Sequence, residues 1–367
     1  MFEFSTPMPY TIENIDKLLE INNNVEKSRI TSLYFSLSPS CHLFTGFEQY
    51  RNSVDKDWDY WKKLISHALT KADIIYLLNA PVFFDIANAD FQLKLNILDD
   101  LLNELKKIGV NKLRVTNNQL LSYIHLKYPD FNLYASTSME YQNIFQYRNF
   151  LYIHPYIKQI VPSHDSNKNF HLLKNLNFLA KDIDIEIMVN EGCLNGCPLR
   201  RLHSYEKYSS DYYFNFFCEK FQKEQPFETL VKSNNIYPWE IEEYSKIGIN
   251  KFKFVGRDVF KEKINERLED YLLYLKGIDS IKNIENIPVS RFIHHLSSNK
   301  ILKQITVKEV RGLLPQINHF KKHGELCSSN CGINCRYCYK CADKIEKTFN
   351  KKQTEIKLRS IPVCVQY

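Results

Sequence analysis

The sequence predicts an α/β barrel of eight strand–helix units, followed by a helical, cysteine-rich, metal-binding extension. Short apolar segments alternate with stretches of helical period. The chain has 367 residues, which is ample for such a barrel and an appendage. Five of its ten cysteines crowd into residues 327–341. We therefore expect a TIM-barrel-like (β/α)8 domain at residues 1–275 and the extension at 276–367.

Runs of apolar, β-branched and aromatic residues predict the strands. Seven runs are evident, and we expect the eighth strand within residues 227–233. The seven predicted strands are 30–37, 73–80, 112–116, 131–137, 158–162, 183–190 and 251–255.

Amphipathic segments of helical period separate these strands, and two of them end on glycine, at Gly109 and Gly248. Such alternation indicates parallel pairing, and about eight units over roughly 250 residues fit a closed barrel better than an open sheet. A Rossmann-like or flavodoxin-like sheet is the alternative, but the sequence lacks GxGxxG and GxxxxGK[ST] turns. The expected helical segments are 57–71, 91–109, 117–128, 169–182, 237–248 and 258–277.

Composition is that of an ordinary globular chain, with 44% hydrophobic and 25% charged residues. The net charge of +7 is spread along the chain, which permits an RNA or another anionic partner and gives no reason to expect DNA. We see no secretory signal and no apolar run long enough to span a membrane. We therefore expect a cytoplasmic location, where clustered cysteines bind metals more often than they form disulfides.

The cysteines form two groups, and only Cys41 and Cys364 stand apart, where we expect ordinary structural thiols. Three plus five cysteines make eight, enough for two four-cysteine sites if one cysteine of the tail joins the first group. The spacings in the tail resemble iron–sulfur runs more than a zinc ribbon, although zinc alone stays an alternative. The first group is Cys193, Cys197 and Cys218, and the second is Cys327, Cys331, Cys335, Cys338 and Cys341.

Residues 331–338 also match the CxxxCxxC pattern of radical S-adenosylmethionine enzymes. In those enzymes most of the barrel follows the motif, whereas only 29 residues follow Cys338 here. Radical chemistry is therefore a minority interpretation, and a cluster-binding tail explains the motif better.

Cys193 and Cys197 fall just past the predicted strand 183–190. Active sites of α/β barrels lie at the carboxyl-terminal ends of the strands. A metal cluster held there would face the barrel mouth, so we favour a functional or substrate-adjacent cluster over a purely structural one.

Four basic side chains lie near the same predicted edge. Arg200 and His203 follow the cysteine pair and could bind an anion or transfer a proton, or could simply orient the loop. Lys253 and Arg257 flank the end of the last predicted strand, where an inward pair would hold a carboxylate or phosphate group. A solvated surface pair is the alternative for these two.

The stretch VNEGCLNGCPLRRLH (189–203), Cys218 and PWEIEEYSKIGINKFKFVGRD (238–258) together resemble the collagenase-like peptidase family U-32, over roughly residues 30–275. The resemblance implies a TIM-barrel-like fold and a 4Fe–4S cluster, with Cys193, Cys197 and Cys218 at cysteine positions of the family pattern. The better-understood relatives take part in oxygen-independent hydroxylation, in ubiquinone synthesis and in tRNA uridine modification. The first two cysteines stand closer together here than in many members, and the likeness is greatest to the uncharacterised branch.

These features predict an iron–sulfur barrel enzyme, or an enzyme subunit, that modifies an anionic small molecule, RNA or peptide without molecular oxygen. One or two 4Fe–4S clusters, with zinc as the alternative, and a protein partner or electron donor are the expected cofactors and partners. A peptidase is the second hypothesis, although the sequence holds neither HExxH nor GxSxG. A non-catalytic redox sensor or scaffold is the third.

Overall fold

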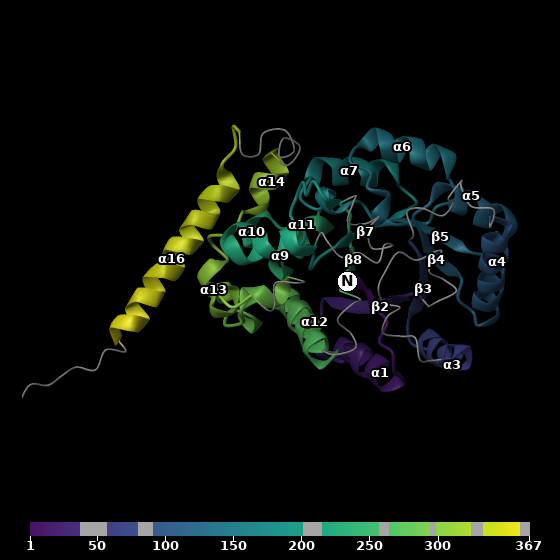
Figure 1. Ribbon diagram of the computed structural model, residues 1–367, viewed down its shortest axis with the longest axis horizontal. Helices are drawn as coiled ribbons and strands as arrows, with labels where there is room; N and C mark the ends of the chain where they lie inside the picture. Colours follow the sequence, from purple (N-terminus) through teal and green to yellow (C-terminus); the bar gives the residue numbers. More distant parts are fainter. Residues whose placement is uncertain are drawn as a thin grey trace, which may run out of the picture.

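Eight parallel strands close into a barrel in chain order, with helices around it (Figure 1). This computed structural model describes residues 1–36, 57–79, 91–200, 215–256, 264–293, 299–323 and 333–359. The predicted (β/α)8 class and the helical C-terminal region are therefore confirmed. The strands are β1 (Phe2–Pro7), β2 (Ser28–Phe35), β3 (Asp73–Leu78), β4 (Lys112–Val115), β5 (Asn132–Ala135), β6 (Gln159–Ile160), β7 (Asp184–Met188) and β8 (Lys251–Lys253).

The predicted eighth strand at 227–233 was wrong, because that segment lies in helix α10 (Pro226–Lys232). Pro226 occupies the start of the helix, where its fixed φ and missing N–H are tolerated. The strand that completes the barrel is instead the N-terminal β1, which pairs with both β2 and β8. The barrel is thus closed by the first residues of the chain.

The helices follow the predicted alternation. Gly109 and Gly248 take φ values of 89° and 87° just after two of the helices, so the expected glycine ends are confirmed. The helices are α1 (Ile12–Glu20), α3 (Trp58–Leu69), α4 (Phe91–Lys107), α5 (Asn118–Lys127), α6 (Ile144–Ile153), α7 (Phe170–Leu179), α9 (Asn215–Glu224), α10, α11 (Ile241–Ser245), α12 (Ile264–Asp279), α13 (Val307–Val310), α14 (Ile317–His323) and α16 (Tyr337–Arg359).

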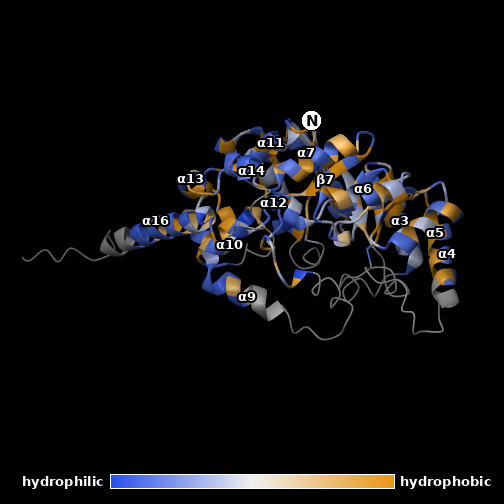
Figure 2. Ribbon diagram, turned by 90° about the horizontal axis from the view of Figure 1, so that it is seen from above, coloured by the Kyte–Doolittle hydropathy of each residue, from blue (hydrophilic) through white to orange (hydrophobic). Residues whose placement is uncertain are grey.

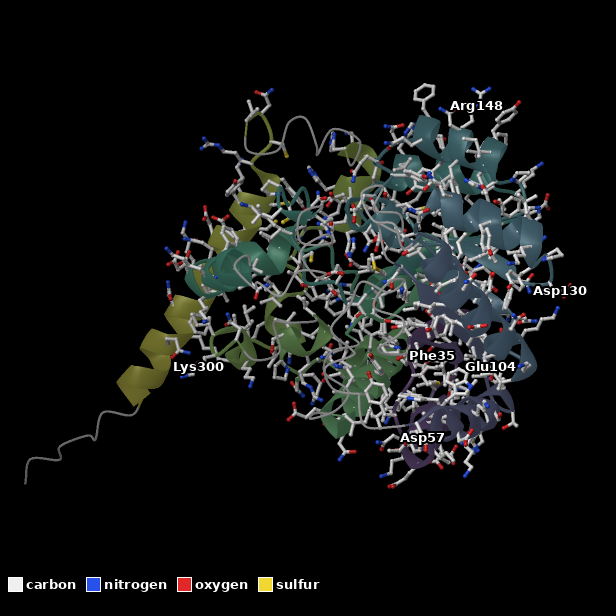
Figure 3. The ribbon with its side chains drawn as sticks, turned by 45° about the vertical axis from the view of Figure 1, so that its right-hand side comes forward. Phe35, Asp57, Glu104, Asp130, Arg148 and Lys300 are labelled. Atoms are coloured by element: carbon white, nitrogen blue, oxygen red, sulfur yellow. The ribbon has the colours of Figure 1, made fainter. Side chains whose placement is uncertain are left out.

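The outer helical layer is fastened by polar contacts as well as by apolar packing. Asp57 caps α3 by accepting a hydrogen bond of 2.8 Å from the Tyr60 backbone N–H. Glu104 on α4 accepts a hydrogen bond of 2.9 Å from the Trp58 indole on α3. Asp57 and Glu104 are both labelled in Figure 3. The second of these bonds ties α3 to α4 outside the barrel.

Side chains alternate between two environments along the strands, as the period of two requires. Leu33 and Phe35 belong to the large apolar cluster that includes buried residues of the helices, whereas Tyr34 between them packs with Ile75 and Leu77. We take this second, smaller cluster as part of the barrel interior. The main core therefore lies between the strands and the helices.

The barrel interior also holds a buried ion pair. Arg114 on β4, which is 1% exposed, donates hydrogen bonds of 2.6 Å to Gln159 on β6 and to Glu186 on β7. Removing one member of such a pair leaves an uncompensated buried charge. The pair therefore ties three strands together beneath the mouth.

The extension continues from α12, which runs through residue 275 to Asp279. Its longest element, α16, lies beside α10 and then projects away from the barrel (Figure 1). Much of α16 is hydrophilic, as Figure 2 shows. No helix in the described part of the chain is both long and apolar enough to cross a membrane. The predicted division at residue 275 stays a prediction.

The buried pair gives the first testable prediction. Glu186→Ala should lower the free energy of unfolding by about 3–5 kcal/mol, because Arg114 then keeps a buried charge without its carboxylate. A double variant, Arg114→Met with Glu186→Leu, should recover part of that loss, because it leaves no buried charge. Urea unfolding measures both, and an unchanged midpoint for Glu186→Ala would contradict the assignment.

Candidate functional site

Polar and charged side chains gather beyond the carboxyl-terminal ends of three neighbouring strands. Glu140 follows β5, His164 and Asp165 follow β6, and Glu191 follows β7. Glu140 and Glu191 are only 5% and 6% exposed. This is the edge at which α/β barrels place their chemistry.

His164 lies between two of these carboxylates. Its Nε2 is 3.0 Å from a Glu191 oxygen, and its Nδ1 is 3.5 Å from a Glu140 oxygen. Burial alone would lower the pKa of His164, but the two carboxylates, Glu191 foremost, outweigh burial and raise it. Although burial works against it, the pKa of Glu191 is held well below its usual value, chiefly by His164. The arrangement therefore favours an imidazolium between two carboxylates.

The backbone at Glu140 is strained. Its φ is 53°, the left-handed region that residues with a side chain rarely adopt. The residue ends a short turn in which its N–H donates a hydrogen bond of 3.0 Å to the Thr137 carbonyl. Such strain persists where the surrounding structure imposes it, and it is common at functional sites. Here it belongs to the residue that places a carboxylate beside His164.

The loop from Cys193 to Cys197 is fixed on both sides. The Cys193 N–H donates a hydrogen bond of 2.8 Å to the Glu191 carboxylate. The Cys193 carbonyl accepts one of 2.8 Å from the Asn234 N–H, and the Asn195 N–H donates one of 2.9 Å to the Lys232 carbonyl. The backbone between the two thiols is therefore held against the end of α10.

Asp165 also holds the loop from Cys193 to Cys197. One carboxylate oxygen accepts hydrogen bonds from the Gly196 N–H at 2.9 Å, from Arg200 at 3.0 Å and from Asn234 at 3.2 Å. Gly196 has a φ of 67°, which glycine adopts without steric cost. A single carboxylate thus joins the ends of β6 and β7 to the segment after α10.

Arg200 is buried in this network, at 7% exposure. It also donates a hydrogen bond of 2.5 Å to the Leu194 carbonyl inside the cysteine loop. Burial would lower the pKa of Arg200, but Cys193 and then Asp165 raise it. These contacts favour the interpretation that Arg200 orients the loop, and an anion-binding role for it stays a prediction.

Lys253 is buried, so the solvated position that the sequence left open for it is not the one it takes. It is 8% exposed, and its Nζ stands 4.4 Å from the centre of the Tyr34 ring. The Tyr34 hydroxyl donates a hydrogen bond of 2.5 Å to the Phe254 carbonyl, which fixes the ring. A cation on an aromatic face is stabilised there, and it remains a positive charge near the mouth.

Several predicted site residues lie outside the described residues, namely His203, Arg257, Cys327 and Cys331. Only the backbone of Cys218 is described, within α9. The roles predicted for these residues stay predictions.

The described thiols are Cys193, Cys197, Cys335, Cys338 and Cys341, and none of them forms a disulfide. Within the described ranges, no three His, Cys, Asp or Glu side chains form a group that could hold a metal ion. Metal binding at either group of cysteines is therefore still a prediction.

One end of α10 contacts both groups of cysteines. Ser233, just after α10, forms an isolated antiparallel bridge with Leu194 of the cysteine loop. On the other side, the Lys232 ammonium lies 3.4 Å from the centre of the Tyr339 ring on α16, next to Cys338. The structure therefore connects the barrel loop and the cysteine-rich tail through one short helix.

Sequence analysis missed Glu140, His164, Asp165 and Glu191. Each follows a strand end by only a few residues, so the strand-end rule could have marked them as candidates. Their convergence around His164 depends on the closed barrel and on the left-handed backbone at Glu140, which no spacing reveals.

Comparison with known proteins finds only distant likenesses. No family model and no curated protein matches the chain. Solved structures that resemble it include a U32 peptidase, with 13% identity, a TM-score of 0.46, and coverage of 70% of this chain and 92% of that one. An N-acetylneuraminate lyase from Fusobacterium nucleatum has 11% identity and a TM-score of 0.37, covering 95% and 98%. A dihydrodipicolinate synthase from Bacillus anthracis has 8% identity and a TM-score of 0.39, covering 95% and 97%.

Asp165→Ala should loosen the cysteine loop. Its three donors lose a shared acceptor, which we expect to cost about 1–3 kcal/mol and to expose the thiols more often. Alkylation of Cys193 and Cys197 in metal-free chain, followed by mass spectrometry, should become faster. The control is Asp130→Ala, an exposed carboxylate paired with Lys106 (Figure 3), and equal rates in both variants would contradict the role of Asp165.

The pKa of His164 predicts a pH dependence. Because this pKa is raised in the folded chain above its usual value of about 6.5, protonation of His164 stabilises the fold. That contribution is complete below about pH 6.5 and is lost as the pH rises through the folded pKa. His164→Gln should therefore flatten the fall in unfolding free energy as the pH rises above about 6.5. His171→Gln, on the exposed side of α7, should leave the slope unchanged.

Proposed function

We propose that the chain is an iron–sulfur enzyme that binds a cluster at its barrel mouth and modifies a substrate without molecular oxygen. One observation carries the proposal. A loop with two thiols, Cys193 and Cys197, is held by hydrogen bonds directly beside a buried group of carboxylates and cations at the carboxyl-terminal edge of the barrel. A metal with only a structural role would not require that position.

The donor set fits a thiolate-bound cluster. Arg200 lies close enough to Cys193 for the thiolate to raise the pKa of the guanidinium, so the charged form of each supports the other. Cys218 lies on α9, which leads directly into α10, and α10 ends against the cysteine loop. Cys193, Cys197 and Cys218 would be three ligands, and one cysteine of the tail could supply a fourth across α10.

When bound, such a cluster supplies electron transfer or an open iron site to a substrate. The residues of the chain would do the rest. His164 would hold a proton between Glu140 and Glu191, available to a substrate at the mouth. Lys253, with Arg257 four residues later and His203 after the cysteine loop, would attract an anionic group on a small molecule, an RNA or a peptide. Electrons would come from a partner protein.

The tail would hold a second metal centre, a 4Fe–4S cluster or zinc, through Cys327, Cys331, Cys335, Cys338 and Cys341. Thiolate ligands persist in a reducing compartment, and the proposed centre therefore suits the expected cytoplasmic location.

The proposal is tested by the absorption and electron paramagnetic resonance spectra of chain purified without oxygen. Wild-type chain should show the broad visible absorption of a cluster, and Cys193→Ala should lose the part that belongs to the barrel site. Cys364→Ala, a cysteine that we expect to have no metal role, is the matched control. A visible spectrum unchanged by Cys193→Ala would place any cluster elsewhere and overturn the proposed site.

A further inference from the structure

Helix α14 brings a histidine to the cysteine-rich tail. His319 Nε2 lies 3.9 Å from the Cys335 sulfur, although sixteen residues separate the two in the sequence. With metal–sulfur bonds of about 2.3 Å and metal–nitrogen bonds of about 2.0–2.1 Å, two ligand atoms of a tetrahedral site stand roughly 3.6 Å apart. The nitrogen and the sulfur are therefore close to the spacing of two ligands of one metal.

Packing orients the imidazole. The His319 ring stacks on the Tyr337 ring, with centroids 3.8 Å apart and an angle of 15° between the planes. The Tyr337 hydroxyl is itself fixed, because it accepts a hydrogen bond of 3.0 Å from the Gln316 N–H. A ligand whose rotamer is set before the metal arrives loses less entropy on binding.

The electrostatics suit a metal ligand. Cys335 precedes α16 by two residues, and Cys338 stands in its first turn. The amino end of this 23-residue helix carries partial positive charge, which favours thiolates there.

We propose that His319 is a metal ligand in the C-terminal extension, in a mixed thiolate–imidazole centre that also uses Cys335. The inference rests on the proposed metal binding by the tail and is independent of the barrel cluster. It gives the tail a ligand that its cysteine spacing alone does not contain. The metal is zinc or the iron of a cluster, and the experiment separates these two.

The experiment measures zinc, iron and acid-labile sulfide per chain on the full chain purified without oxygen. His319→Ala should lose as much metal as Cys335→Ala loses, and His319→Cys should retain it, because a thiolate can replace the imidazole. His323→Ala, one turn further along α14, should keep the wild-type content. Retention of all metal in His319→Ala would overturn the proposal.

X-ray absorption reports the atoms bound to the metal directly. The absorption edge to measure is that of the element, zinc or iron, whose content falls in Cys335→Ala. At the zinc edge, a nitrogen shell at about 2.0–2.1 Å beside sulfur at about 2.3 Å supports the proposal. At the iron edge, the supporting result is a change between wild type and His319→Cys from a nitrogen to a sulfur ligand. A shell of sulfur alone in wild type would contradict it.

The contact could instead be a thiol–imidazole hydrogen bond without metal. In that case Cys335 would react rapidly with iodoacetamide in chain as purified, and His319→Ala would slow the reaction, which would overturn the proposal. The barrel proposal is judged separately. Iron that is lost in Cys193→Ala but is unaffected by His319→Ala would leave the barrel site standing and refute only the ligand in the extension.

Discussion

The carboxylate of Asp165 is the constraint on which the candidate site depends. It accepts hydrogen bonds from Gly196, Arg200 and Asn234, three residues that follow β7 and α10. Without this acceptor, the three donors would lose a shared partner and the backbone between the two thiols would lose part of its support. A residue placed by β6 therefore decides the shape of a loop that follows β7.

The mouth combines three carboxylates with two cations. Glu140 and Glu191 face His164, and Asp165 faces Arg200. Removing so many charges from water is unfavourable, and only close pairing of opposite charges offsets the lost hydration. Such buried, mutually shifted groups are typical of functional sites, and the left-handed backbone at Glu140 adds strain of the same kind.

Beneath the barrel mouth, one buried ion pair and apolar packing hold the strands and helices together. The Arg114 ion pair joins β4, β6 and β7 in the interior, while large apolar side chains fill the space between strands and helices. Because the strands are buried on both faces, most of them are mainly apolar in the sequence. That is why seven strands and the barrel class could be predicted from composition and period alone.

The errors of prediction have physical causes. The strand β1 has polar residues at Glu3, Ser5 and Thr6 and ends in Pro7, so its apolar signal is weak, yet it closes the barrel by pairing on both sides. The segment 227–233 resembles a strand in composition, but Pro226 begins a helix there, and packing against α16 buries it. The local sequence pattern reveals neither the pairing of β1 on both sides nor the packing of α10 against α16.

Some residues of the candidate site could be predicted from the sequence, and others could not. Cys193 and Cys197 could be predicted because two thiols after a strand are conspicuous by residue type. The partners of His164 could not, because they come from three strand ends that only the closed barrel brings together. His319 was visible as a residue, but only the packing of α14 against the start of α16 places it beside Cys335.

The most direct test of the account is the amount of iron and acid-labile sulfide per wild-type chain purified without oxygen, with zinc measured on the same sample. The account predicts about four irons and four sulfides for one cluster, or about eight of each for two. Chain that holds one or two zinc ions and no iron would contradict the proposed redox chemistry at the barrel mouth.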